Sequence, residues 1–449
     1  MRNAIKCLKV GRPAGAGFDN NKPRSWMSKS LVAMVVTQGL GAFNDNLLKT
    51  VISLILVGRA VGAGDGSAYL SLTGVAFILP YLLFSGYAGY LADRYHKRTV
   101  IVAAKGTEVF IVLASILALL LDQTGLMIAA LFLMATQSTF ISPAKYGLLP
   151  EILPEIHLSQ ANGVMESMRY FAVISGTVTG GLLLGLNGNS LSVISVVLFA
   201  AAITGVASSL FICNVPNRND TVPASRLSVW HGMRTGIRRI QTSRALRFAV
   251  AGTTCLEFMG CLVLLDLILV VKTVIGLGDA EVGIVGGCVG LGAACGSYVS
   301  GRISRSQLRP FYAILGIAGV ALTLVNLSAV VDFRLVAALV CVLGTFGGGA
   351  VVPLYALLQR EARTEERGQI IACNNFLNMT GVLLASGCLW LLNDLLGLAP
   401  EHILFWSGAV LLLIVCVALR CWPEYGFASF LQTVLVASRR AGSSSRILS

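Results

Sequence analysis

The chain contains about twelve apolar stretches, each close to the roughly 20 residues that a helix needs to cross a bilayer. Inside lipid, helices satisfy all their backbone hydrogen bonds within the segment, so such stretches favour membrane-spanning helices. Only 12% of the residues are charged, whereas a soluble domain carries about 25%. The sequence therefore predicts an all-α membrane protein. The predicted spans are 30–57, 68–92, 99–121, 126–147, 160–186, 190–213, 246–272, 280–301, 311–331, 335–358, 369–392 and 402–422.

Basic residues collect in the loops on one predicted side of the membrane. That side carries 94–98, 214–244, 302–309 and 360–367. The other side carries only three basic residues, namely Arg59, Lys272 and Arg334. The positive-inside rule then places both termini in the cytoplasm. The net charge of +13 has the same origin, so it does not indicate nucleic-acid binding.

The predicted organisation is two six-helix halves joined by a basic segment. We expect a cytoplasmic arm at 1–28, a first half at 29–213, a cytoplasmic linker at 214–244, a second half at 245–424 and a cytoplasmic tail at 425–449. The two halves echo each other weakly, because P-A-K-Y-G-L-L in the first resembles P-L-Y-A-L-L in the second. Such internal repeats are typical of rocker-type secondary transporters. The linker reads either as a short amphipathic helix on the anionic inner leaflet or as a solvated connection.

A polar triplet interrupts the first span near its middle. Asn44, Asp45 and Asn46 lie about where the bilayer midplane falls. A charged side chain at that depth costs roughly 2.5–3.5 kcal/mol on insertion scales, so it is a functional-site hypothesis by default. Under the competing interpretation, Lys49 one turn later simply neutralises Asp45.

Two clusters at the cytoplasmic ends of spans carry further polar residues. The loop G-Y-L-A-D-R-Y-H-K-R resembles the cytoplasmic loop signature of the major facilitator superfamily, and that resemblance implies gating roles for Gly89, Asp93, Arg94 and Arg98. The second cluster contains Lys145 beside a helix-bending proline, and Lys145 either snorkels to the headgroups or faces the interior.

The fifth span opens with a polar stripe. Asn162, Glu166 and Arg169 are spaced by four and three residues, so they share one helix face. A polar face on a membrane helix points inward. Glu166 is expected to pair with Arg169 or to reach Lys145, which would make a cytoplasmic gate.

Three motifs together resemble one transporter family. A-F-N-D-N-L-L-K, S-P-A-K-Y-G-L-L-P-E and A-N-G-V-M-E-S are similar to the lysophospholipid transporter family of the major facilitator superfamily. The likeness is greatest to the forms fused to a 2-acylglycerophosphoethanolamine acyltransferase. It implies a twelve-helix major facilitator fold. It also implies alternating-access flipping of lysophosphatidylethanolamine and related lysophospholipids to the inner leaflet of a bacterial cytoplasmic membrane, where they are reacylated.

A lysophospholipid headgroup offers an ammonium and a phosphate. Asp45 suits the ammonium, and Lys145 or Arg169 suits the phosphate. The expected substrate-binding residues are Asn44, Asp45, Asn46, Lys145, Tyr146, Asn162, Glu166 and Arg169. Glycine-rich runs supply either a thin wall for the acyl chain or tight helix packing. Glu257 and Asp266 lie in the second half and match no motif, so their roles stay open between cation coupling and contact with the amine.

We expect no enzymatic activity, no cofactor and no metal. The acyltransferase pattern His-x-x-x-x-Asp is absent, no Cys-x-x-Cys occurs, and the four His are far apart. The tail from Pro423 to Arg440 resembles a junction helix, so a separate acyltransferase is the expected partner beside membrane lipids. One alternative is proton-coupled efflux of drugs or metabolites with Asp45 or Glu166 as the proton carrier. Another is a scaffold that transports nothing.

Overall fold

The computed structural model describes residues 27–60, 66–185, 190–215, 229–304 and 310–426. Within these ranges, twelve helices are at least 17 residues long. They are α2 (Lys29–Ala60), α3 (Gly66–Arg94), α4 (Lys97–Leu120), α5 (Thr124–Ile152), α6 (Leu158–Leu184), α7 (Ser190–Leu210), α9 (Arg244–Leu269), α10 (Asp279–Ile303), α11 (Phe311–Leu327), α12 (Phe333–Glu361), α13 (Arg367–Trp390) and α14 (Pro400–Cys421).

Each predicted span coincides with one of these helices. The starts differ by at most two residues and the ends by at most five. Ten of the helices are long and apolar enough to cross a membrane. The exceptions are α11, which has 17 residues, and α6, whose apolar run is interrupted by the polar stripe. The predicted fold class, an all-α twelve-helix membrane protein with two six-helix halves, is confirmed.

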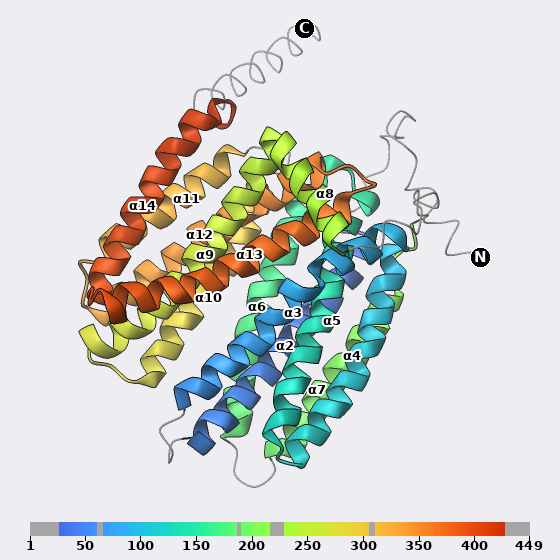
Figure 1. Cartoon of the computed structure of the whole chain (residues 1–449), viewed down its shortest axis with the longest axis horizontal. Coiled ribbons are helices and arrows are strands. Elements are labelled where there is room, and N and C mark those ends of the chain that lie inside the picture. The colour runs from blue at the N-terminus through green and yellow to red at the C-terminus, as the bar shows by residue number, and fades with distance from the viewer. Residues whose placement is uncertain (1–26, 61–65, 186–189, 216–228, 305–309, 427–449) are drawn as a thin grey trace, which may run out of the picture.

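The helices form two bundles that meet along one side (Figure 1). In the first half, α2 packs on α6 and α7, while α5 packs on α3 and α4. In the second half, α10 and α11 pack on α12, and α13 packs on α9. The main contacts between halves pair α6 with α10 and α3 with α13. Four helices, two from each half, therefore build most of the interface between the bundles, and α5 and α12 add smaller contacts.

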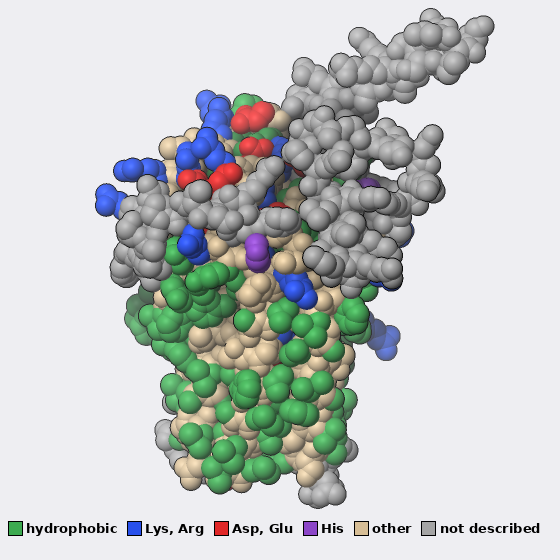
Figure 2. Space-filling view, turned by 90° about the vertical axis from the view of Figure 1, so that its right-hand side faces the viewer, with side chains coloured by type: hydrophobic (Ala, Val, Ile, Leu, Met, Phe, Trp, Pro, Cys, Tyr) green, Lys and Arg blue, Asp and Glu red, His purple; other side chains and the backbone are tan. Residues whose placement is uncertain are grey.

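One end of the bundle, called here the basic end, carries most of the Lys and Arg side chains. It includes Lys97 at the start of α4, Arg244 at the start of α9 and Arg367 at the start of α13. Figure 2 shows blue side chains in the upper part of the molecule and a largely hydrophobic surface below. The first described helix begins at this end and the last one finishes there. That the basic end faces the cytoplasm remains a prediction of the positive-inside rule.

The linker contains helix α8 (Val229–Thr242), which packs on α3, α9 and α13. Met233 and Ile240 are buried, and Arg239 forms an ion pair of 2.8 Å with Glu366. Of the two interpretations of the linker, the structure shows the helix. Two of its apolar residues thus face protein, whereas Ile237 is 36% exposed, so contact of this helix with the inner leaflet remains a prediction. The predicted arm and tail lie almost entirely outside the described residues.

Candidate functional site

A cavity of about 310 Å³ lies between the two halves. The first half lines it with residues of α2, α3, α4, α5 and α6, and the second half with residues of α9, α12 and α13. Its walls combine apolar and aromatic side chains with charged groups of both signs. Polar groups converging in a mostly apolar pocket between helices are the usual form of a small-molecule site.

Asp45 lines this cavity rather than facing bulk lipid. Its side chain is nearly buried, and its Oδ2 accepts a hydrogen bond of 2.6 Å from the Ser138 hydroxyl. Its Oδ1 has no hydrogen-bond partner among the described residues. A buried carboxylate oxygen without a partner is costly, so this atom is well placed to receive a donor from a ligand.

The two asparagines that flank Asp45 differ in position. Asn46 lines the cavity, and its amide donates to the Ala42 carbonyl of its own helix at 2.8 Å. Asn44 is fully buried on another face of α2, where its amide donates to Glu108 and to the Leu198 carbonyl. Asn44 therefore supports the wall of the cavity from behind rather than lining it.

The structure does not pair Asp45 with Lys49. The Lys49 ammonium lies 4.9 Å from the centre of the Phe77 ring, and Phe77 lines the cavity. The interpretation in which Lys49 neutralises Asp45 is therefore not realised in this structure.

Lys145, Tyr146 and Arg169 also line the cavity, and Glu166 supports them. Arg169 donates to Glu166 at 2.7 Å, and the Tyr146 hydroxyl donates to the other oxygen of the same carboxylate. Glu166 is fully buried. Lys145 lies 4.8 Å from the centre of the Tyr146 ring. Of the two partners expected for Glu166, the structure therefore selects Arg169.

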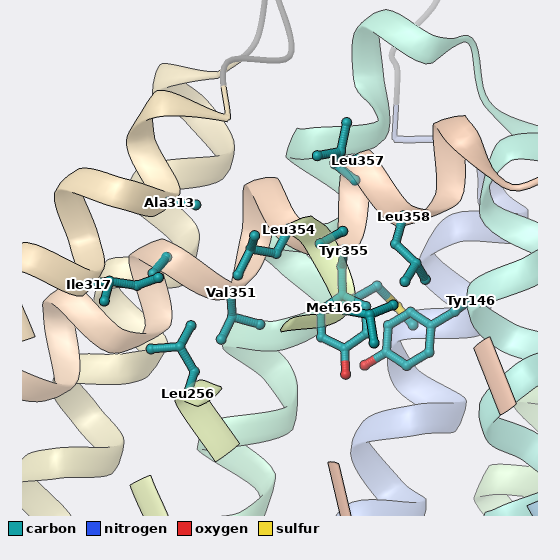
Figure 3. Close-up of a cluster of buried hydrophobic side chains, with 14 of the residues drawn as sticks. Tyr146, Met165, Leu256, Ala313, Ile317, Val351, Leu354, Tyr355, Leu357 and Leu358 are labelled. Atoms are coloured by element: carbon teal, nitrogen blue, oxygen red, sulfur yellow. The ribbon is translucent and has the colours of Figure 1, made fainter. Parts of the chain in front are cut away.

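Cross-half contacts close the cavity toward the basic end. Tyr146 stacks on Tyr355 with ring centres 4.8 Å apart, and Figure 3 shows the two rings side by side. Asn375 donates to Ser142 at 2.8 Å. All of these residues lie in the part of α5, α12 and α13 nearest the basic end.

Asn162 lies closer to the basic end than these residues, in the second turn of α6. Its side-chain amide exchanges two hydrogen bonds with Gln359 on α12, at 2.7 and 2.9 Å. Both residues are fully buried. Asn162 was expected to bind substrate, but the structure places it in a contact between the halves and outside the lining of the cavity.

Asp93 caps a helix of the opposite half. Its two oxygens accept from the backbone N–H groups of Gly368 and Gln369 at 2.6 and 2.9 Å, in the first turn of α13. A carboxylate there satisfies free N–H groups and complements the helix dipole. Gly89 makes the approach possible, because a Cβ on it would lie 2.9 Å from the Gly368 carbonyl oxygen.

The two arginines of the loop signature lie beside this contact. Arg94 is the last residue of α3 and is partly exposed. Arg98 donates to the Leu210 carbonyl at 3.0 Å, which ties α4 to the end of α7. Gly89 and Asp93 therefore join the halves, whereas the described bond of Arg98 lies within one half.

Helix α4 contains a buried ion pair that was not predicted from the sequence. Lys105 and Glu108 pair with each other and are almost fully buried. Glu108 also accepts from Asn44 at 3.1 Å and from Gln137 at 2.9 Å. Gln137 is adjacent to Ser138, so the pair connects to Asp45 through hydrogen bonds.

Two glycines make room for this ion pair. A Cβ on Gly41 would lie 3.0 Å from the Lys105 ammonium, and one on Gly205 would lie 3.1 Å from its last methylene. The sequence did contain a signal for this pair. Two opposite charges lie three residues apart inside a predicted span, and charged residues inside a span are rare, which is also the reason for choosing Asp45.

Glu257 and Asp266, the two acids of the second half whose roles were left open, differ in their position relative to the cavity. Glu257 lines the cavity from α9, across from the first half. Asp266 is fully buried nearer the end of α9, and neither of its oxygens has a hydrogen-bond partner among the described residues. Only Glu257 is therefore placed to meet a ligand in this cavity.

Comparison with known proteins agrees with the fold and with the motifs. A family model described as Major Facilitator Superfamily matches residues 34–386. Lysophospholipid transporter LplT of Serratia proteamaculans is 27% identical over 364 residues, covering 80% of this chain and 88% of the relative. The protein of the same name from Cronobacter sakazakii is 28% identical over 384 residues, covering 82% and 90%. The resemblance expected from the motifs is confirmed.

Solved structures agree on the fold alone. The human organic anion transporter MFSD10 superposes with a TM-score of 0.71 at 12% identity, covering 86% of this chain and 98% of that one. FucP, a major facilitator transporter in its outward conformation, superposes with a TM-score of 0.66 at 16% identity, covering 88% and 99%.

Proposed function

The chain belongs to the major facilitator superfamily, and we propose that it moves lysophospholipids, lysophosphatidylethanolamine among them, between membrane leaflets by alternating access. The relatives named as lysophospholipid transporters, which match most of the chain, support this substrate class. The proposed direction is from the outer to the inner leaflet of a bacterial cytoplasmic membrane, with both termini in the cytoplasm. A separate acyltransferase would then restore the second acyl chain.

One observation carries the proposal: the cavity holds a carboxylate with an unpartnered oxygen, Asp45, together with the cations Lys145 and Arg169. A lysophospholipid of the ethanolamine class carries an ammonium and a phosphate a short distance apart. Charge-assisted hydrogen bonds to both groups are stronger than neutral ones, and they offset the loss of headgroup hydration.

The contacts between the halves fit the closed side of an alternating-access cycle. Asp93 on the start of α13, Asn162 with Gln359, and the stacked tyrosines all lie on the basic side of the cavity. For the headgroup to leave toward the basic end, these contacts must separate. Gly89, Asp93, Arg94 and Arg98 are proposed to act in this gate rather than on the substrate.

The test is uptake of labelled lysophosphatidylethanolamine by cells that lack their own transporter. We expect the full-length chain to restore uptake and intracellular reacylation. Drug tolerance is measured in the same cells. Raised tolerance without lipid uptake would replace the proposal with efflux, and reacylation without uptake would favour a scaffold.

A further inference from the structure

Lys49 extends the cavity-lining face of α2 beyond Asp45. It lies four residues after Asp45 and seven after Ala42, and both of those residues line the cavity. Residues spaced by four and seven share one face of a helix. The side chain of Lys49 therefore belongs to the same face, about 6 Å further toward the end opposite the basic end.

No carboxylate among the described residues forms an ion pair with Lys49. Its contact is with Phe77, an aromatic ring of the cavity wall, and Asp45 is held by Ser138 instead. Lys49 precedes the end of α2 at Ala60 by 11 residues, or about 16 Å, so its backbone lies well inside the helix. An ammonium kept inside a span without a counter-ion is costly, so it points to a ligand that supplies one.

Lys49 and Lys145 lie on opposite sides of Asp45 along the membrane normal. Helix α5 runs toward the basic end, and Ser138, which contacts Asp45, precedes Lys145 by seven residues. Lys145 is therefore about 10 Å closer to the basic end than Ser138. Along this face a cation beside the cavity wall is followed by the carboxylate and then by the cation Lys145 inside the cavity, each reached from the one before by a step of one or two helical turns.

We propose that Lys49 forms an entry subsite for the phosphate group of a lysophospholipid, an inference that rests on the proposed function. With the ammonium on Asp45, the phosphate is two carbons away and lies against Lys49. As the headgroup descends, the phosphate passes from Lys49 to Lys145. The Phe77 ring holds the ammonium of Lys49 beside the cavity wall when no anion is bound.

The experiment measures binding of fluorescent lysophosphatidylethanolamine to the purified full-length chain in nanodiscs. We expect Lys49→Met to weaken binding about tenfold, the loss of one charge-assisted hydrogen bond, and Lys49→Arg to retain most of the affinity. Lys29→Met is the matched control, because Lys29 lies on the same helix but is exposed at the basic end. A monoacylglycerol, which has no phosphate, should bind both lysine variants like the unmodified chain.

Several results would overturn the subsite. One is unchanged affinity in Lys49→Met, or in Lys49→Gln if the methionine variant does not fold. Another is displacement of the lipid by millimolar inorganic phosphate, which would make free phosphate the ligand. If the unmodified chain fails to bind the lipid at all, the proposed function fails rather than the role of Lys49.

Discussion

Asn162 on α6 and Gln359 on α12 each donate one hydrogen bond to the other and accept one in return, at 2.7 and 2.9 Å, although 197 residues separate them in sequence. The exchange is fully buried and joins the two halves on the basic side of the cavity. A reciprocal amide pair of this kind holds one arrangement of the halves without a net charge. It therefore suits a contact that must break and reform in every transport cycle.

We predict that Asn162→Leu shifts the protein toward the state that is open at the basic end. Losing two buried hydrogen bonds costs about 2 kcal/mol and changes the ratio of the two states by at least tenfold. The shift is measured as a longer distance between spin labels at Tyr95 and Arg363, two exposed positions at that end, in a background without the native cysteines. Asn326→Leu is the control, because the described side-chain hydrogen bond of Asn326 goes to Leu322 of its own helix. An unchanged distance distribution would mean that the pair does not restrain the halves.

Asp93→Asn should slow transport more than it weakens substrate binding. An amide oxygen can still accept one N–H of the first turn of α13, but it loses the charge that favours the helix N-terminus. We expect the maximal uptake rate to fall several-fold while KM changes little. Asp122→Asn is the matched control, since Asp122 pairs with Arg59 at the opposite end. A raised KM at an unchanged maximal rate would move Asp93 from the gate to the substrate.

Because Glu166 and Arg169 form an ion pair, exchanging their charges should preserve part of the transport activity. Combining Glu166→Arg with Arg169→Glu should recover part of the uptake that each single substitution loses, because the exchange restores an i, i+3 pair on the same helix face. Exchanging Lys145 with Glu166 should recover less, since these two side chains do not pair in this structure. Equal recovery in both double variants would show that the pairing changes during transport.

Breaking the buried pair on α4 should destabilise the protein strongly. Glu108→Met leaves the Lys105 ammonium buried without its counter-ion, and such losses cost about 3–5 kcal/mol. Replacing both residues by Met removes the isolated charge, so we expect it to restore much of the lost stability. The measurement is the thermal unfolding temperature in detergent. A double variant no more stable than Glu108→Met would contradict this explanation, because removing the isolated ammonium would then bring no gain.

The fold was largely predictable from the sequence, for a physical reason. A helix needs about 20 apolar residues to cross lipid, and it satisfies all its backbone hydrogen bonds within the segment. The predicted spans therefore coincide with the helices to within a few residues. Helix ends are less constrained, because a helix can continue past the residues that lipid requires. Helix α5 runs to Ile152, five residues past the predicted end of that span.

The site was predictable only in part. An acid in the middle of a span identified Asp45. Successive residues point about 100° apart around a helix, so the three residues of the triplet face different directions, and the sequence did not show that Asn44 is the one facing away from the cavity. The partner of Asn162 lies in the other half, and nothing near it in sequence names Gln359. Lys105 and Glu108 could have been predicted, unlike the partner of Asn162. Their charges lie within a predicted span, and only their burial was unknown from the sequence.

The most direct test of the account is the initial rate of lysophosphatidylethanolamine uptake by Asp45→Asn, compared with the unmodified chain at equal membrane abundance. We predict a loss of at least tenfold, because the amide keeps the shape of the side chain but withdraws the charge from the ammonium. Asp122→Asn should retain normal uptake. A normal rate in Asp45→Asn would contradict the central claim that this carboxylate receives the lipid headgroup.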